Sequence, residues 1–193
     1  MQPSNEKQKA WQEGLNLFNK KNLVLLETGR IRNPSWKDSD GDSTNYFSRL
    51  DNISIIYSID NDSENFSGFE SSEEYCKKTL SEEQLSKIIF VNGHSVEKIN
   101  ELEDNFFDVV LLDSANDSQL IYEEFVSVIS KVKEESLIII DDVTSPGFKG
   151  DKVLSFLDSI GIGYTKKIAN PADCAYFFLN KESIELIKKK LVK

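Results

Sequence analysis

Residues 107–113 read FDVVLLD and residues 137–142 read LIIIDD, so two short apolar runs each end in aspartate. Uninterrupted runs of Val, Ile and Leu are typical of parallel strands that are buried on both faces. Three similar runs begin at Leu23, Ile53 and Ile88. The pattern predicts five buried strands, over residues 23–26, 53–59, 88–91, 109–112 and 137–140.

Segments with helical spacing of their apolar residues separate these strands. Helices are expected over residues 5–20, 44–50, 72–87 (as one helix or two), 96–102 and 119–132, with another after Gly150. Two strands, at 164–169 and 175–179, and a lysine-rich helix complete the chain. The alternation predicts an α/β fold, namely a Rossmann-like, doubly wound, mostly parallel seven-stranded sheet with helices on both faces and an antiparallel strand near the C-terminus.

The length of 193 residues suits one hydrophobic core. We expect a single domain over 1–193, with an N-terminal helical extension (1–21), a core (22–179) and a C-terminal helix (180–193). The net charge of -10 argues against nucleic acid as a partner. No apolar stretch approaches the ~20 residues that span a bilayer, so no membrane partner and a cytoplasmic location are expected.

Polar residues gather where the predicted strands end. They are Glu27-Thr28-Gly29, Asp60, Asn92-Gly93-His94-Ser95, Asp113 and Asp141-Asp142. In an open parallel sheet, ligands bind beyond the carboxyl ends of the strands, where the strand order reverses. Carboxylates on strands ~4.8 Å apart repel one another unless a cation or a donor-rich ligand lies among them. The sequence therefore predicts a ligand site at this edge.

Together these residues resemble the class I S-adenosylmethionine (SAM) methyltransferases, over roughly residues 22–179. An acidic-x-Gly motif closes the first strand in that family, and Glu27-Thr28-Gly29 matches it, with Ser43 and Thr44 opening the next helix. Gly29 lacks a Cβ and would let the backbone approach the methionyl part of the cofactor. The usual closely spaced glycines are replaced by an insertion at 30–40, so the motif is a variant.

The same resemblance implies further cofactor contacts. Asp60 matches the acid that accepts hydrogen bonds from both ribose hydroxyls, and Asp62 is a nearby competitor. Gly93-His94-Ser95 stands where the family carries an acid for the adenine amino group, so either Ser95 or a backbone carbonyl would accept that hydrogen bond. His94 is more simply a pocket or surface residue than a general base.

The two aspartate-ended strands are similar to those of the catechol and caffeoyl-coenzyme A type O-methyltransferases. Asp113, Asp141 and Asp142 match the positions that bind a divalent cation there, and Asp113 and Asp141 are the expected catalytic residues. Carboxylate oxygens favour Mg²⁺, Mn²⁺ or Ca²⁺ over Zn²⁺. Such a cation would lower the pKa of a substrate hydroxyl. The alternative is that these acids only cap strands and accept hydrogen bonds from loop amides.

One position departs from that pattern. Asn116 stands three residues after Asp113, where those enzymes carry a Lys or His that could act as base, and asparagine cannot take a proton. Deprotonation would then rest on the metal, on His94 or Lys149, or on a substrate that is already ionised. Arg30 and Arg32 could pair with the cofactor's carboxylate or an acidic substrate, or be solvated.

The expected function is SAM-dependent methyl transfer to an oxygen of a small hydroxylated acceptor, with Mg²⁺ or another divalent cation as an optional cofactor. The resemblance also allows a homodimer. One alternative is a catalytically inactive SAM-binding or protein-interaction module of the same fold. A nicotinamide-dependent oxidoreductase is a second alternative, but the Gly-x-Gly-x-x-Gly motif that its cofactor needs is missing.

Overall fold

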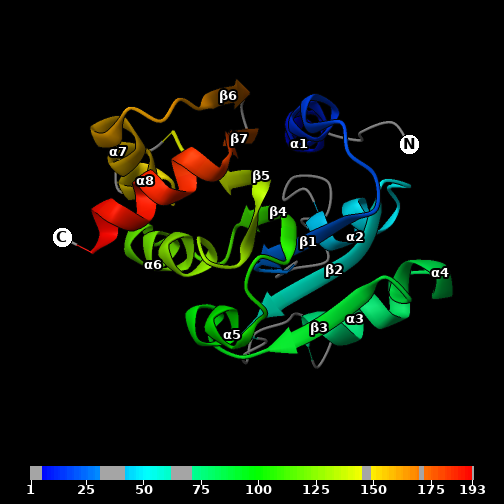
Figure 1. Cartoon of the computed structure of the whole chain (residues 1–193). Coiled ribbons are helices and arrows are strands. Elements are labelled where there is room, and N and C mark those ends of the chain that lie inside the picture. Colours follow the sequence, from blue (N-terminus) through cyan, green and yellow to red (C-terminus); the bar gives the residue numbers. More distant parts are fainter. Residues whose placement is uncertain (1–5, 31–41, 62–70, 145–148, 170–171, 193) are drawn as a thin grey trace.

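The computed structural model describes residues 6–30, 42–61, 71–144, 149–169 and 172–192. Seven strands form one sheet in the order β3-β2-β1-β4-β5-β7-β6 (Figure 1). They are β1 (Leu23–Thr28), β2 (Ile53–Asp60), β3 (Ile88–Asn92), β4 (Phe107–Leu112), β5 (Val132–Asp141), β6 (Thr165–Ala169) and β7 (Ala172–Leu179). Strands β1 to β5 are parallel to one another, whereas β7 is antiparallel to both β5 and β6. The predicted fold class is confirmed.

The strand order reverses between β1 and β4. From β1 the chain runs outward through β2 to β3 on one side, and from β4 through β5 on the other. Leu25 of β1 pairs with Ile56 of β2 on one flank and with Val109 of β4 on the other. Ligands of doubly wound sheets bind beyond the strand ends at such a switch point. The topology therefore places a candidate site beyond Thr28 and Leu112.

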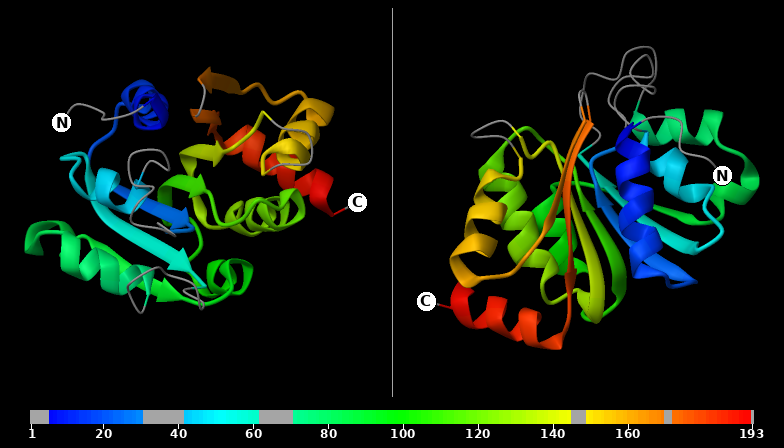
Figure 2. Two further views of the ribbon diagram at one scale, coloured as in Figure 1. Left: turned by 180° about the vertical axis from the view of Figure 1, so that it is seen from behind. Right: turned by 90° about the horizontal axis from the view of Figure 1, so that it is seen from above.

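Helices cover both faces of the sheet, as the right-hand view of Figure 2 shows. On one face lie α1 (Glu6–Phe18), α2 (Ser43–Ser48), α3 (Ser72–Thr79) and α4 (Glu82–Leu85). On the other lie α5 (Ser95–Glu101), α6 (Ser118–Val128), α7 (Asp151–Ile160) and α8 (Lys181–Leu191). Among the described helices, none combines the length and the apolar character needed to cross a membrane.

Each face has its own apolar core. Trp11 of α1 is fully buried and stacks on Phe47 of α2, with ring centroids 5.2 Å apart. On the opposite face, Phe125 of α6 packs edge-on against Phe177 of β7. All six residues of β1 and of β4 are buried, as their continuous apolar runs predicted. The turns that follow these two buried central strands form the first part of the candidate site.

Two predicted helices have different bounds in the structure. The segment 72–87 forms two helices because Ser81 starts α4 with a capping box, in which its hydroxyl accepts from the Gln84 amide. The predicted helix 119–132 ends as α6 at Val128, and Val132 begins β5 opposite Phe107. Val132 is buried in the sheet, so an apolar residue four positions after Val128 does not by itself indicate a continuing helix.

Candidate functional site at the carboxyl edge of the sheet

The turn after β1 is built on Gly29. Its φ is +87°, in the left-handed region, and its amide donates to the Ile59 carbonyl of β2 at 2.8 Å. A Cβ at this position would lie 2.8 Å from the carbonyl carbon of Asp113 and 2.9 Å from Cα of Ser114. The close approach of β4 therefore requires glycine here, whatever ligand the turn binds.

Glu27 is the acid of the first-strand motif and is completely buried. Its Oε1 accepts hydrogen bonds from the hydroxyls of Thr44, at the start of α2, and Ser58, at 2.6 Å. Its Oε2 has no hydrogen-bond partner among the described residues. Burial raises the pKa of Glu27 to about 7, although hydrogen bonds from Ser58, Thr44 and Ser43 act in the opposite direction. The structure thus brings the predicted cofactor-binding residues Glu27, Ser43 and Thr44 together.

Thr28 lies on the opposite face of β1 from Glu27. Its hydroxyl donates to Glu124 of α6 at 2.8 Å and accepts from the Asp113 amide at 3.2 Å. Burial raises the pKa of Glu124, while the hydroxyls of Ser114, Ser95 and Thr28 oppose this shift. The sequence analysis did not identify Glu124 as a site residue. Its position between Ile121 and Val128 on the apolar face of α6 could have indicated a buried carboxylate.

Asp60 ends β2 beside the turn of β1. Its Oδ2 accepts from the Arg30 amide at 2.6 Å, and its carbonyl accepts from the Gly93 amide at 3.0 Å. The Arg30 side chain is buried, lies over the Phe90 ring at 5.4 Å and donates to Asn92 at 2.5 Å. Its Nε and Nη1 atoms have no hydrogen-bond partner within the described part of the chain. Arg30 therefore points toward β3.

The segment after β3 turns directly into α5. Gly93 has a φ of +142°, which favours glycine, and His94 is the exposed residue before the helix, with no side-chain capping bond. Ser95 is buried at the first position of α5, and its hydroxyl is one of the three that hydrogen-bond Glu124. The structure thus keeps Gly93 and His94 near Asp60 through backbone pairing, but it orients Ser95 inward.

Three aspartates converge at the ends of β4 and β5. One carboxylate oxygen from each of Asp113, Asp141 and Asp142 lies within 4.8 Å of the others. Asp142 has a φ of +50°, and its amide donates to the Asp173 carbonyl of β7 at 2.9 Å. Asp141 is completely buried, and its Oδ1 has no hydrogen-bond partner in the described residues. The three aspartates that follow the apolar runs of β4 and β5 thus lie together at one edge of the sheet.

Two buried lysines lie among these aspartates. The Lys7 ammonium of α1 is 2.7 Å from Asp141 Oδ2. The Lys149 ammonium, just before α7, hydrogen-bonds Asp113 and lies 3.1 Å from Asp142 Oδ2 and 3.7 Å from Asp141 Oδ2. Burial alone would lower the pKa of both lysines, but the surrounding aspartates outweigh it and raise both values. Both lysines are therefore cations within the cluster.

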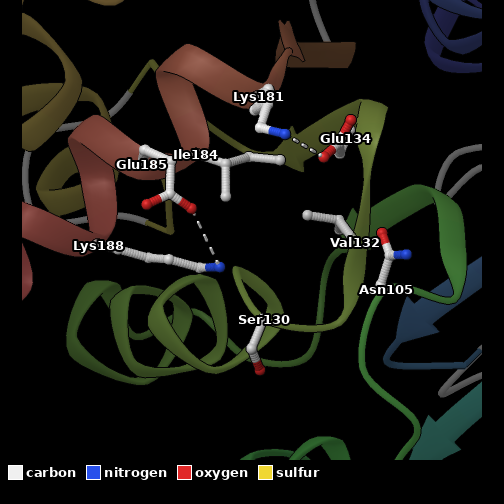
Figure 3. A pocket seen from close by; sticks show the side chains of 8 residues that line it. All are labelled: Asn105, Ser130, Val132, Glu134, Lys181, Ile184, Glu185 and Lys188. Carbon is white, nitrogen blue, oxygen red and sulfur yellow. Dashed lines mark ion pairs between the residues drawn. The ribbon is translucent and has the colours of Figure 1, made fainter.

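One further predicted position, Asn116, belongs to the described residues. Asn116 is exposed in the loop after β4. Asp62 and Arg32 are outside the described residues. A separate pocket of about 210 Å³ lies at the opposite end of the sheet, between α8 and the start of β5 (Figure 3). Its lining carries the ion pair of Lys181 with Glu134 at 3.1 Å, and none of the strand-end residues belongs to it.

Comparison with known proteins shows the fold. No protein-family model matches the chain, and no curated protein sequence matches it. The structure is similar to the MycE methyltransferase from the mycinamycin biosynthetic pathway, solved with Mg and S-adenosylhomocysteine (SAH), with a TM-score of 0.61 and 13% identity. That match covers 90% of this chain and 50% of MycE.

Two other solved structures resemble the chain over more of their own length. A putative rRNA methylase from Clostridium thermocellum matches with a TM-score of 0.63 and 8% identity, over 92% of this chain and 98% of the methylase. CalS11, a TDP-rhamnose 3'-O-methyltransferase of calicheamicin biosynthesis, matches with a TM-score of 0.60 and 14% identity, over 88% and 77%. The chain therefore has the class I methyltransferase fold that its motifs predicted.

Proposed function

We propose that this protein is a SAM-dependent methyltransferase that transfers the methyl group to an oxygen of a small hydroxylated acceptor. The observation that carries the proposal is the convergence of Gly29, Asp60 and Asp113 at the switch point of the sheet. Solved structures with this fold include methyltransferases in complex with SAH, which supports SAM as the cofactor.

The buried polar atoms at the site fit this cofactor. Glu27 Oε2 is a buried acceptor without a partner in the described residues, and Arg30 offers two buried donors in the same situation. A ligand that carries both an ammonium and a carboxylate group, as the methionyl part of SAM does, complements these charges. Asp60 would accept hydrogen bonds from the ribose hydroxyls, and the Gly29 turn would bring backbone close to the ligand.

The chain's own residues would position the acceptor. When bound, SAM supplies a methyl group on a positively charged sulfur, so transfer depends mainly on alignment of the attacking oxygen. The side chains of Asp113 and Asp142 remain 15% and 30% exposed, so they can accept a hydrogen bond from an acceptor hydroxyl. The exposed Asn116 cannot take the proton. The acceptor oxygen would therefore be held by the carboxylates of Asp113 and Asp142, which follow β4 and β5. One of these carboxylates would accept the hydroxyl proton as the oxygen takes the methyl group and SAH is released.

The acceptor class is inferred from charge. Structural neighbours include both a sugar O-methyltransferase and a putative rRNA methylase. A net charge of -10 disfavours phosphate-rich acceptors, because binding to nucleic acid depends largely on lysine and arginine contacts with phosphates. A small hydroxylated molecule is the class that the charge supports better.

Thermal unfolding with SAH tests the cofactor assignment. A ligand at ~100 times its dissociation constant should stabilise the fold by ~2.7 kcal/mol. We expect this shift in the wild type, a loss of most of it in Asp60→Ala, and its retention in Asp51→Ala, where an exposed aspartate at the other end of β2 is removed. NAD(H) provides the control for the oxidoreductase alternative.

Each outcome has a definite meaning. An SAH shift followed by transfer of labelled methyl to a hydroxylated acceptor supports the enzyme. An SAH shift without transfer across a broad acceptor panel favours the catalytically inactive binding module. The absence of any SAH shift, with or without Mg²⁺, would contradict the proposal.

A further inference from the structure

Lys149 occupies the centre of the aspartate cluster. Its ammonium lies within 4 Å of carboxylate oxygens of all three aspartates, Asp113, Asp141 and Asp142. This is the position that an oxygen-ligated cation would need, because a cation bound by all three aspartates must touch an oxygen of each. The three carboxylates are therefore already drawn together by a protein cation.

Lys7 supplies a second charge from a distant part of the chain. Its ammonium is 2.7 Å from Asp141 Oδ2 and 3.8 Å from Asp142 Oδ1. The helix that carries it, α1, packs against β5 and β7 next to the cluster. Both lysine side chains are only 4% to 5% exposed, and lysine is almost never buried to this extent unless it is paired. The fold thus places two buried cations, Lys7 and Lys149, among the three aspartates.

The charges match those of a metal site. The two ammonium groups bring two positive charges to the three aspartates, as one divalent ion would. A divalent ion added beside the lysines would meet two like charges at short range in a poorly solvated place. Carboxylate oxygens are suitable ligands for a hard divalent cation. Here, however, they are arranged around Lys7 and Lys149, and this arrangement does not fit a divalent ion as well.

We propose that Lys7 and Lys149 are the resident cations of this site, in place of a divalent metal ion. The protein would then hold its acceptor without a metal, which distinguishes it from the metal-assisted O-methyltransferases that its sequence resembles. This consequence for catalysis rests on the proposed function. The occupancy of the cluster by lysine does not, and can be tested separately.

Manganese binding provides the test, because Mn²⁺ prefers oxygen ligands and its free concentration can be followed by electron paramagnetic resonance. We expect no stoichiometric Mn²⁺ binding by the wild type. The variants Lys149→Met and Lys7→Met/Lys149→Met keep apolar stems of similar length but leave the carboxylates without cations. We expect them to bind Mn²⁺ roughly 100-fold more tightly than the wild type.

Two controls locate the new binding. Adding Asp113→Asn to the double variant should abolish the gained Mn²⁺ binding. Lys131→Met removes another buried lysine, which pairs with Asp104 at 2.7 Å far from the cluster, and should gain none. If the double variant is unstable, thermal unfolding of Lys149→Met with and without Mn²⁺ reports the same effect, since Mn²⁺ should restore its stability.

The inference would be overturned by wild-type protein that binds one Mn²⁺ and loses it on Asp141→Asn. It would also be overturned by folded lysine variants that gain no Mn²⁺ affinity. SAH binding is measured on the same samples. A wild type that binds neither SAH nor Mn²⁺, with lysine variants that gain Mn²⁺, would reject the proposed function and leave the lysine assignment standing.

Discussion

Gly29 is the residue on which the first-strand turn depends. Its positive φ costs a residue with a Cβ about 1 to 3 kcal/mol, and the approach of Asp113 and Ser114 adds a steric clash. We therefore expect Gly29→Ala to lower the free energy of unfolding by more than about 2 kcal/mol in urea titrations.

A matched glycine separates the two causes of this loss. Gly161 ends α7 with a φ of +74°, but a Cβ there would have no neighbour within 4 Å. Gly161→Ala should therefore cost only about 1 kcal/mol. Equal losses in the two variants would show that the contact with β4 contributes nothing.

Glu27 makes stability depend on pH. The pKa of Glu27 is about 7 in the folded protein and 4.5 in the reference state, so the folded chain binds this proton more tightly. Proton binding by Glu27 therefore stabilises the folded protein. This contribution is fully present below pH 4.5 and is lost as the pH rises through about 7. Glu27→Gln lacks this titration, so its free energy of unfolding relative to that of the wild type should rise by about 2.5 kcal/mol between about pH 5 and about pH 8.

Urea unfolding at the two pH values, without cofactor, measures this difference. Glu83→Gln changes an exposed glutamate of α4 and serves as the control. A Glu27→Gln difference that stays constant between the two pH values would contradict the raised pKa of Glu27.

Several site residues could be predicted one by one, but their partners could not. Asp113, Asp141 and Asp142 each follow an apolar strand, and parallel strands end at one edge, so local patterns were sufficient. Lys7 is 134 positions from Asp141, and nothing in its neighbourhood indicates that it enters the site. Lys149 was considered only as a base. Pairing of this kind arises from tertiary packing alone.

At the scale of elements, α1 is part of the site and not only a cover for the core. Trp11 is fully buried between α1 and α2, and Lys7 lies one helical turn before it. Trp11→Ala should cost about 3 to 5 kcal/mol of unfolding free energy because it leaves a large cavity. Leu17→Ala on the same helix, at a position 61% exposed, should change it by less than about 0.5 kcal/mol.

Urea titration checks both changes. A loss of less than about 1 kcal/mol in Trp11→Ala would contradict the docking of α1 on this face.

Element boundaries were the part of the fold that sequence patterns predicted least well. Apolar spacing places Val132 equally well at the end of a helix or at the start of a strand, and pairing with Phe107 decides between them. The break between α3 and α4 depends on the cap at Ser81, which apolar periodicity does not register. Strand interiors were predicted because full burial leaves a simple apolar signature.

At the scale of the whole molecule, the net charge leads to an expectation about RNA binding. A chain with net charge -10 should show no saturable binding to a structured RNA at ~0.15 M salt. Fluorescence anisotropy with a labelled RNA hairpin measures this. Tight binding that weakens steeply as salt is raised would instead indicate a nucleic-acid acceptor, like that in the name of one structural neighbour.

The position of β7 has a consequence for synthesis of the protein. This strand is inserted between β5 and β6, and α1 packs against it, with the Tyr176 hydroxyl donating to Glu13 at 2.9 Å. The ribosome makes α1 before β1 and makes β7 only after α7 and β6. The face of α1 that meets β7 therefore stays without this partner until Tyr176, 163 positions after Glu13, has left the exit tunnel.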